Sequence, residues 1–208
     1  RELCRVLGPS HVRALDLNAQ MLEVARALAP EVEFTRGRAE ELPYDSESFD
    51  AVLCQFGLMF FDPPESALRE MMRVLTPGGV LVVAVWAPLE QTPGYAAMAQ
   101  LLERLFGPDI AAHLHAPFKY GDTTELKALL SSAGIQNAEL ETIVGKAHFP
   151  SIEAWVHTEI RGWTLAEHID DAQYERLLAA AQAELGHFVT DGRVAFDSPA
   201  HIVRVGKG

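Results

Sequence analysis

The sequence contains few cysteines and no long hydrophobic run. Its two cysteines, Cys4 and Cys54, are too few for a disulfide framework, and neither has the CxxC or Cys/His spacing of a metal site. The longest apolar run, VLVVAVWAP, is far too short to span a membrane, and we expect no signal peptide. We therefore expect a cytoplasmic protein that uses no metal and has no membrane partner.

Basic residues are also scarce. Lysine and arginine total 17 against 29 aspartates and glutamates, which gives a formal net charge of −12. A surface that binds nucleic acid or an anionic membrane needs clustered positive charge, so we expect neither partner. The 208 residues, 49% of them hydrophobic, are enough for one domain with a well-buried core. The sequence carries no signal for an oligomeric state.

Short strands alternate with helices over the first 86 residues. We expect strands at HVRAL, EVEF, FDAVLCQF and VLVVAVW, a helix at 19–28 capped by Asn18, and a helix at 67–75. Such alternation with short turns implies parallel strands joined by right-handed crossovers. The predicted fold class is α/β. We expect a doubly wound, Rossmann-like, mostly parallel sheet with helices on both faces, an antiparallel last strand and helical lid insertions.

The rhythm changes after residue 87. The pattern predicts helices at 94–107, 121–134, 151–161 and 171–185, and strands at 135–149 and 201–205. Asp122 with Glu125, and Asp170 with Gln173, have the spacing of capping boxes. Pro199 is expected to break or bulge the start of the last strand.

The segment VRALDLNAQML ends an apolar strand on a carboxylate, Asp16. In a doubly wound sheet, an acidic residue at the end of the second strand can accept hydrogen bonds from the ribose hydroxyls of a nucleotide-like cofactor. From this feature alone, a loop-capping role fits Asp16 equally well.

Four segments in order extend the pattern. They are VRALDLNAQMLEVAR, VEFTRGRAEELPYDSESFDAVLCQFGLMFF, ALREMMRVLTPGGVLVV, and a closing pair of strands after an extra helix. Together they resemble the class I S-adenosylmethionine-dependent methyltransferases that act on small molecules. The resemblance implies one domain over 1–208: a cofactor-binding core at 1–86, lid or substrate insertions at 87–118 and 151–190, and closing elements at 119–150 and 191–208.

The resemblance also implies site residues. Asp16 matches the family's ribose-binding acid, and Leu17 and Met21 lie where apolar side chains pack on the adenine, although Met21 fits a core position equally well. Ala39 lies where a backbone amide meets the adenine ring, flanked by Arg38 and Glu40. Cys54, Gln55 and Phe56 follow the strand that holds the methionine end of S-adenosylmethionine. Phe60 and Phe61 are candidates for the methyl-transfer cavity, with helix packing an equal alternative.

Two departures from the family are visible. Its glycine-rich loop after the first strand is absent; the loop should lie immediately before RELCRVL, so we expect a first strand and loop upstream in the natural protein. Arg38 stands where the family often has an acid that accepts a hydrogen bond from the adenine. A guanidinium has donors only, so Glu40 or a water must accept that bond, or the contact is lost.

The methyl acceptor is expected to be a small apolar or aromatic molecule. Its binding candidates include His115, Tyr120 and Trp155, and an apolar pocket is indicated by Trp155, Trp163 and Phe188. No catalytic residue is assigned; the general-base candidates, each also explained as a surface or packed residue, are His113, His115, Tyr120, His157 and His187. One alternative is a non-catalytic methyltransferase-like scaffold. A nicotinamide oxidoreductase is less favoured, because the sequence lacks the Tyr-x-x-x-Lys type of catalytic pair.

Overall fold

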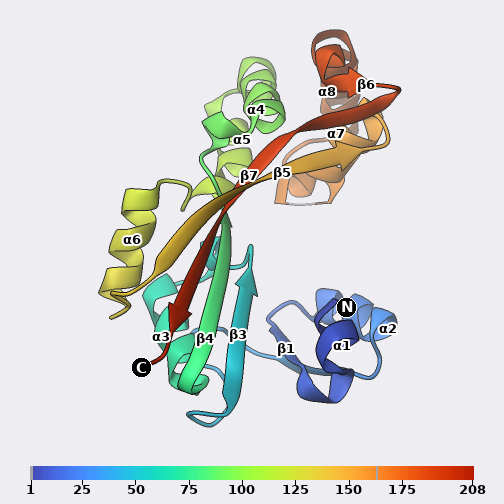
Figure 1. The fold of residues 1–208 in the computed structure, drawn as a ribbon. Coiled ribbons are helices and arrows are strands. Elements are labelled where there is room, and N and C mark those ends of the chain that lie inside the picture. Colours follow the sequence, from blue (N-terminus) through green and yellow to red (C-terminus); the bar gives the residue numbers. More distant parts are fainter. Residues whose placement is uncertain (1, 163) are drawn as a thin grey trace.

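A computed structural model describes residues 2–162 and 164–208 of the chain, and Figure 1 shows their arrangement. The N-terminal part consists of α1 (Glu2–Leu7), β1 (Arg13–Asp16), α2 (Ala19–Leu28) and β2 (Glu33–Arg36). Strands β1 and β2 pair in parallel, with Asp16 opposite Arg36. They form a two-stranded sheet of their own, with no hydrogen-bonded pairing to the larger sheet among the described residues.

The larger sheet has the strand order β3-β4-β7-β5, with β6 paired to β7. Its strands are β3 (Phe49–Gln55), β4 (Leu75–Trp86), β5 (Glu139–Phe149), β6 (Val189–Thr190) and β7 (Arg193–Gly206). Strands β3 and β4 are parallel and are joined by α3 (Pro64–Val74), whereas β7 runs antiparallel to both β4 and β5. The expected Rossmann-like α/β class is confirmed, but its strands lie in two sheets and not in one continuous sheet.

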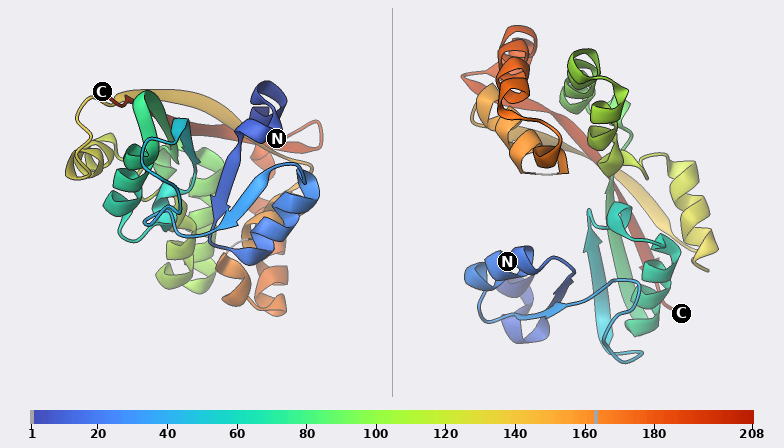
Figure 2. Two further views of the ribbon diagram at one scale, coloured as in Figure 1. Left: turned by 90° about the horizontal axis from the view of Figure 1, so that it is seen from below. Right: turned by 180° about the vertical axis from the view of Figure 1, so that it is seen from behind.

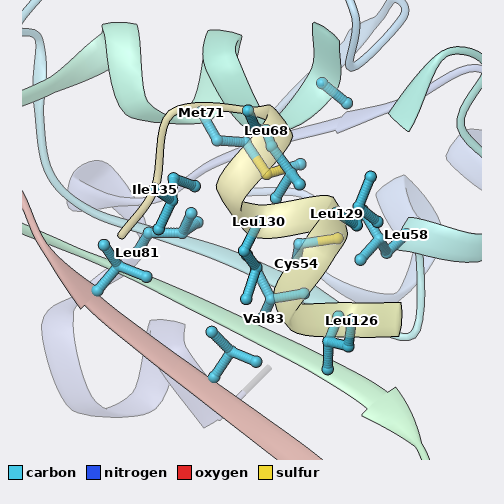
Figure 3. Packing of buried hydrophobic residues seen from close by; sticks show 14 of the residues in the cluster. Cys54, Leu58, Leu68, Met71, Leu81, Val83, Leu126, Leu129, Leu130 and Ile135 are labelled. Carbon is cyan, nitrogen blue, oxygen red and sulfur yellow. The ribbon is translucent and has the colours of Figure 1, made fainter. Parts of the chain in front are cut away.

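A first hydrophobic core lies between the larger sheet and two helices, α3 and α6 (Thr123–Ser132). Figure 3 shows Leu126, Leu129 and Leu130 of α6 in one cluster with Leu81, Val83 and Cys54 of the strands. The side chains of Leu81 and Leu126 are fully buried. Each such side chain contributes about 1.5–3 kcal/mol by leaving water, so this packing holds the strand ends that carry the site.

A second core lies within the helices inserted after β4. It unites α4 (Pro93–Phe106), α5 (Pro108–His115), α7 (Ile152–Arg161) and α8 (Asp171–Glu184) with the far ends of β5 and β7. Figures 1 and 2 show the two long strands passing from the larger sheet into this helical region. The 3-10 turns of the chain are Pro9–His11, Leu58–Phe60, Leu89–Gln91, Ala116–Phe118, Thr164–Glu167 and Gly186–Phe188.

Helix ends follow the capping residues of the sequence. The Asn18 side chain accepts hydrogen bonds from the backbone N–H groups of Gln20 and Met21, and α2 has the expected bounds. Asp170 and Gln173 form the expected capping box. At α6 only half of the expected box forms: Asp122 accepts from two backbone N–H groups, while Glu125 does not return the bond.

The last strand exists and is antiparallel as expected, but its predicted start at Pro199 was wrong. Strand β7 begins at Arg193, and Pro199 lies inside it, opposite Val144 of β5. The Pro199 carbonyl accepts a hydrogen bond from the Ala87 N–H at 3.1 Å. Ala87 is the first residue after β4, so Pro199 lies opposite the end of that strand. The proline therefore removes no hydrogen bond of the β4–β7 ladder, and the strand continues through it.

None of the helices in the described part of the chain combines the length and the apolar character needed to cross a membrane.

Candidate functional site

Asp16 is the last residue of β1, and its carboxylate is exposed. Its Oδ1 atom accepts a hydrogen bond from the N–H of Asn18 at 2.7 Å, and its own carbonyl accepts from Gly37 N–H at 3.1 Å. Two neighbouring apolar side chains are also exposed: Leu17 is 54% accessible and Met21 57%. This end of β1 therefore presents a carboxylate beside uncovered apolar surface.

The loop after β2 is tied to the segment after β3 by hydrogen bonds to the backbone of Asp62. Glu40 Oε1 accepts from Asp62 N–H at 2.8 Å and from Arg38 Nη2 at 3.1 Å, and Arg38 also donates to the Asp62 carbonyl. Burial raises the pKa of Glu40, but its backbone hydrogen bonds and the Arg38 guanidinium outweigh this and leave the pKa lowered. An ionised Glu40 thus holds Arg38 in place, and Ala39 between them is buried.

The carboxyl end of β3 carries Cys54, Gln55 and Phe56. Cys54 is buried, and desolvation raises the pKa of its thiol to about 11 against the opposing effect of the Gly57 and Leu58 N–H groups, so the sulfur stays protonated. Phe56 has a positive φ of 53°, and its N–H donates to the Ala84 carbonyl of β4 at 2.9 Å. This backbone turn directs the Phe56 ring onto Trp86, with parallel rings 3.8 Å apart between centroids.

A cavity of about 410 Å³ begins at this stacked pair. It extends over β5 and β7, where its walls include Ile143, Ala147, Phe149 and Ile202. Few polar groups line the cavity. The Ser198 Oγ is buried and has no hydrogen-bond partner among the described residues. Lys146 also lines the cavity, and its Nζ pairs with Asp197 at 2.9 Å. The size and the mainly apolar lining are those of a small-molecule site.

Tyr95 of α4 joins this cavity to a buried carboxylate. The Tyr95 hydroxyl donates to Glu159 Oε1 at 3.0 Å, and the Glu159 side chain, on α7, is only 7% exposed. Burial raises the pKa of Glu159 to about 7, although the hydrogen bond from Tyr95 opposes the change. Burial, together with the Glu159 charge, also raises the pKa of Tyr95, so the phenol keeps its proton and the carboxyl titrates near neutral pH.

The first part of the chain matches a known protein family. Residues 1–83 match the family described as a methyltransferase domain. The demethylmenaquinone methyltransferase of Staphylococcus carnosus is 32% identical over 158 residues, which cover 69% of this chain and 65% of that protein. A ubiquinone/menaquinone biosynthesis C-methyltransferase of Stutzerimonas stutzeri is 31% identical over 163 residues, 70% of this chain and 63% of that protein.

Solved structures agree in fold. A putative methyltransferase from Bacillus halodurans superposes with a TM-score of 0.58 at 23% identity, covering 94% of this chain and 82% of that one. A putative methyltransferase from an antibiotic biosynthesis pathway of Anabaena variabilis superposes with a TM-score of 0.63 at 16% identity. The superposition covers 92% of this chain and 81% of that one. The chain belongs to the class I S-adenosylmethionine-dependent methyltransferases. The chain spans between 31% and 65% of the length of the curated relatives that it matches.

In this chain, the residues expected at the cofactor lie on two sheets. Asp16, Leu17 and Met21 lie at β1 and α2, and Cys54, Gln55 and Phe56 lie at the end of β3. The loop with Arg38, Ala39 and Glu40 links the two parts through Asp62. Gln55 is exposed and Cys54 is buried in the first core.

The residues expected at the acceptor are spread over the molecule. None of Phe60, Phe61, His115, Tyr120 and Trp155 lines the 410 Å³ cavity. Phe60 is 58% exposed, Phe61 packs against the first core with Tyr120, and Trp155 is fully buried in the second core. His115 lines a separate hollow with Phe118 and Lys119. Trp163 lies outside the described residues.

The other general-base candidates lie apart from the cavity. His113 stacks on His168 with centroids 4.2 Å apart, His187 packs on Phe188, and His157 is exposed on α7. Within residues 2–162 and 164–208, no three His, Cys, Asp or Glu side chains gather where they could hold a metal ion.

Sequence reasoning missed Tyr95, Glu159 and Ser198 as site residues. The sequence does contain a signal for Glu159: it falls among Trp155, Val156 and Ile160 on the apolar face of a predicted helix. A lone carboxylate at such a position needs a partner or a function.

Proposed function

We propose that this methyltransferase transfers a methyl group from S-adenosylmethionine to a small, hydroxylated aromatic acceptor of the quinol type. The observations that carry the proposal are the match of residues 1–83, which include Asp16, Ala39 and β3, to a methyltransferase domain, and the similarity of the chain to demethylmenaquinone and ubiquinone/menaquinone methyltransferases. The acidic surface and the small apolar cavity support a small-molecule acceptor.

The residues present fit the cofactor. The exposed Asp16 carboxylate has oxygens available for the two ribose hydroxyls, and the uncovered Leu17 and Met21 offer apolar surface to the adenine. We expect the backbone of Ala39 to border the adenine. Glu40 is already engaged by Arg38 and Asp62 N–H, so it supports the loop through Oε1.

The methionine end is assigned to Cys54, Gln55 and Phe56, through backbone groups and the Gln55 amide. Because the thiol of Cys54 is neutral and buried, we assign it no nucleophilic role. Bound S-adenosylmethionine would supply an electrophilic methyl group on a sulfonium sulfur. The protein's contribution is to place the acceptor in line with it, which can supply up to about 7–11 kcal/mol of the barrier reduction.

The first test is calorimetric titration of S-adenosylhomocysteine into the protein at its natural full length. Asp16→Ala is expected to weaken binding by about 10- to 100-fold, because hydrogen bonds to a charged group contribute about 1.5–3 kcal/mol. The matched control is Glu31→Ala, which removes an exposed carboxylate of the same N-terminal part and should bind like the wild type.

The outcomes separate the alternatives. Absence of S-adenosylhomocysteine binding with retained folding would favour a non-catalytic scaffold. Binding of NADH in place of S-adenosylhomocysteine would favour the oxidoreductase. Equal affinity of Asp16→Ala and wild type would remove Asp16 from the cofactor site.

A further inference from the structure

The buried Glu159–Tyr95 pair has no evident structural need. The carboxylate of a residue that is only 7% exposed loses hydration, and one hydrogen bond from Tyr95 at 3.0 Å replaces only part of it. A well-packed apolar residue at position 159 would avoid this loss. Buried titratable groups beside a cavity are typical of functional sites.

Tyr95 lies between this carboxylate and the cavity. Its ring lines the cavity, and it is fixed by edge contacts with Phe196 at 5.2 Å and Trp155 at 6.4 Å between centroids. The hydroxyl hydrogen is directed to Glu159, so the phenol oxygen retains lone pairs that can accept a hydrogen bond. Ser198, with its unpartnered buried Oγ, offers a second polar group to the same cavity.

The other end of the cavity meets the proposed methionine end of the cofactor. Phe56 belongs to both: it directly follows Cys54 and Gln55 on β3, and its ring, stacked on Trp86, borders the cavity. Because β3 and β4 are parallel neighbours, this stack stands at the carboxyl edge of the sheet, where α/β sheets bind ligands. A flat ring in the cavity would therefore lie between the transferable methyl group and Tyr95.

We propose that this cavity is the acceptor site and that Tyr95, backed by Glu159, binds a phenol-type hydroxyl of the acceptor and takes up its proton. The inference rests on the proposed function. The acceptor's O–H proton passes to Tyr95 Oη while the Tyr95 proton passes to the Glu159 carboxylate. The freed electron pair conjugates into the ring, and the ortho carbon forms the new bond to the methyl carbon; the electrons of the broken carbon–sulfur bond stay on sulfur.

The ring carbon then loses its hydrogen as a proton, and the oxygen regains a proton from Glu159 through Tyr95. The net change is one methyl group gained and one proton released. Ionised Glu159 is the form that accepts the proton, and a pKa of about 7 leaves much of it ionised at neutral pH. Among the charged groups lining the cavity, Lys146 is engaged by Asp197, and His148 is exposed to solvent.

The test compares two probe ligands on the full-length protein loaded with S-adenosylhomocysteine, which cannot react. The probes are 1,4-naphthohydroquinone, kept anaerobic, and 1,4-dimethoxynaphthalene, which lacks the hydroxyls. Wild type is expected to bind the hydroquinone at least about tenfold more tightly, because a site built around a hydroxyl rejects an analogue without one. Tyr95→Phe should abolish this preference, and Ser198→Ala should reduce it.

A second readout is turnover of the hydroquinone with S-adenosylmethionine. Tyr95→Phe and Glu159→Gln are expected to lower kcat by about 100-fold while KM for S-adenosylmethionine stays unchanged, as for loss of general-base assistance. The matched controls are Tyr44→Phe, which removes a buried phenol hydroxyl next to Phe49, and Glu184→Gln, which removes an exposed carboxylate paired with Arg104. Both controls should behave like wild type.

The outcomes distinguish this proposal from the proposed function. If wild type fails to bind S-adenosylhomocysteine, the methyltransferase function falls and the proposal with it. If S-adenosylhomocysteine binds but wild type shows no preference for the hydroquinone, only the acceptor proposal is overturned. The same conclusion follows if Tyr95→Phe and Ser198→Ala both keep the preference for the hydroquinone. If Tyr95→Phe does not fold, the binding preference of Ser198→Ala and the kcat of Glu159→Gln decide.

Discussion

Replacing Gly94 by alanine should destabilise the protein, although alanine is the better helix former. Gly94 lies in the first turn of α4, and an added Cβ would sit 2.4 Å from Cδ1 and Cε1 of Phe196 on β7. Carbon atoms pack best at about 3.5–4.0 Å, so the ring would have to retreat by more than about 1 Å. Phe196 is 4% exposed and packs on Trp155 at 4.9 Å, which leaves it little room.

Two opposing effects set the magnitude. Overpacking of a close-packed core costs about 1–3 kcal/mol, and the clash here is with an aromatic ring enclosed on several sides. The gain in helix propensity from glycine to alanine is at most about 1 kcal/mol and is smaller in a first turn. We therefore expect a net loss of about 1–2 kcal/mol, equivalent to about 2–8 °C in Tm for a chain of this size.

Urea unfolding monitored by tryptophan fluorescence measures the loss. The matched control is Gly186→Ala, because a Cβ at Gly186 meets nothing within 4 Å; it should change stability by less than about 0.5 kcal/mol. In a Phe196→Leu background, Gly94→Ala should cost at least about 1 kcal/mol less, since the clashing ring is gone. Equal stability of Gly94→Ala and wild type would refute the close approach of α4 to β7.

Three further predictions concern single side chains. Burial raises the pKa of Glu159 to about 7, above the roughly 4.3 of the unfolded chain, so the folded state binds the extra proton and loses stability as the pH rises between these values. In denaturant titrations, the free energy of unfolding of Glu159→Gln should therefore exceed that of wild type by up to about 3 kcal/mol at pH 8 and by little at pH 4.5. An equal difference at both pH values would contradict the burial of Glu159. Asp170→Ala removes the capping box of α8 and should cost about 1 kcal/mol by the same assay, whereas no loss would argue against that cap. Because the Cys54 thiol is buried and its pKa is raised to about 11, iodoacetamide at pH 8 should alkylate it far more slowly in native than in urea-unfolded protein, as read by mass spectrometry; equal rates would show that the thiol is accessible.

Local features of the fold could be predicted from the sequence. The ends of α2 and α8 follow from Asn18 and Asp170, because a cap depends on residues only two or three positions away. The place of β7 between β4 and β5 could not be foreseen, since strand pairing depends on contacts between distant segments. The early start of β7 was missed for the same reason: Pro199 is tolerated only because β4 ends opposite it.

The candidate site divides in the same way. Asp16 was found because it ends a strand, and strand ends are visible in the apolar pattern, whereas Phe56 and Phe60 were named from the resemblance to the family. Trp155 and Tyr120 were chosen for their chemistry, and the structure places both in the two cores, while Phe60 lies on the surface. Ser198 and Tyr95 come together only through the pairing of β5 with β7 and the packing of α4, which no local pattern encodes.

The position of β7 between β4 and β5 also bears on how the chain folds. Trp86 pairs with Ala200, so residues 87–199 must be spanned before the central ladder of the larger sheet can form. Closing such a long loop is entropically costly and slow, unless intervening structure shortens it. The second core can do this, because its helices pack on the far ends of β5 and β7 and bring β7 back toward β4. We therefore expect the helical region to order first and the β4–β7 ladder to close late.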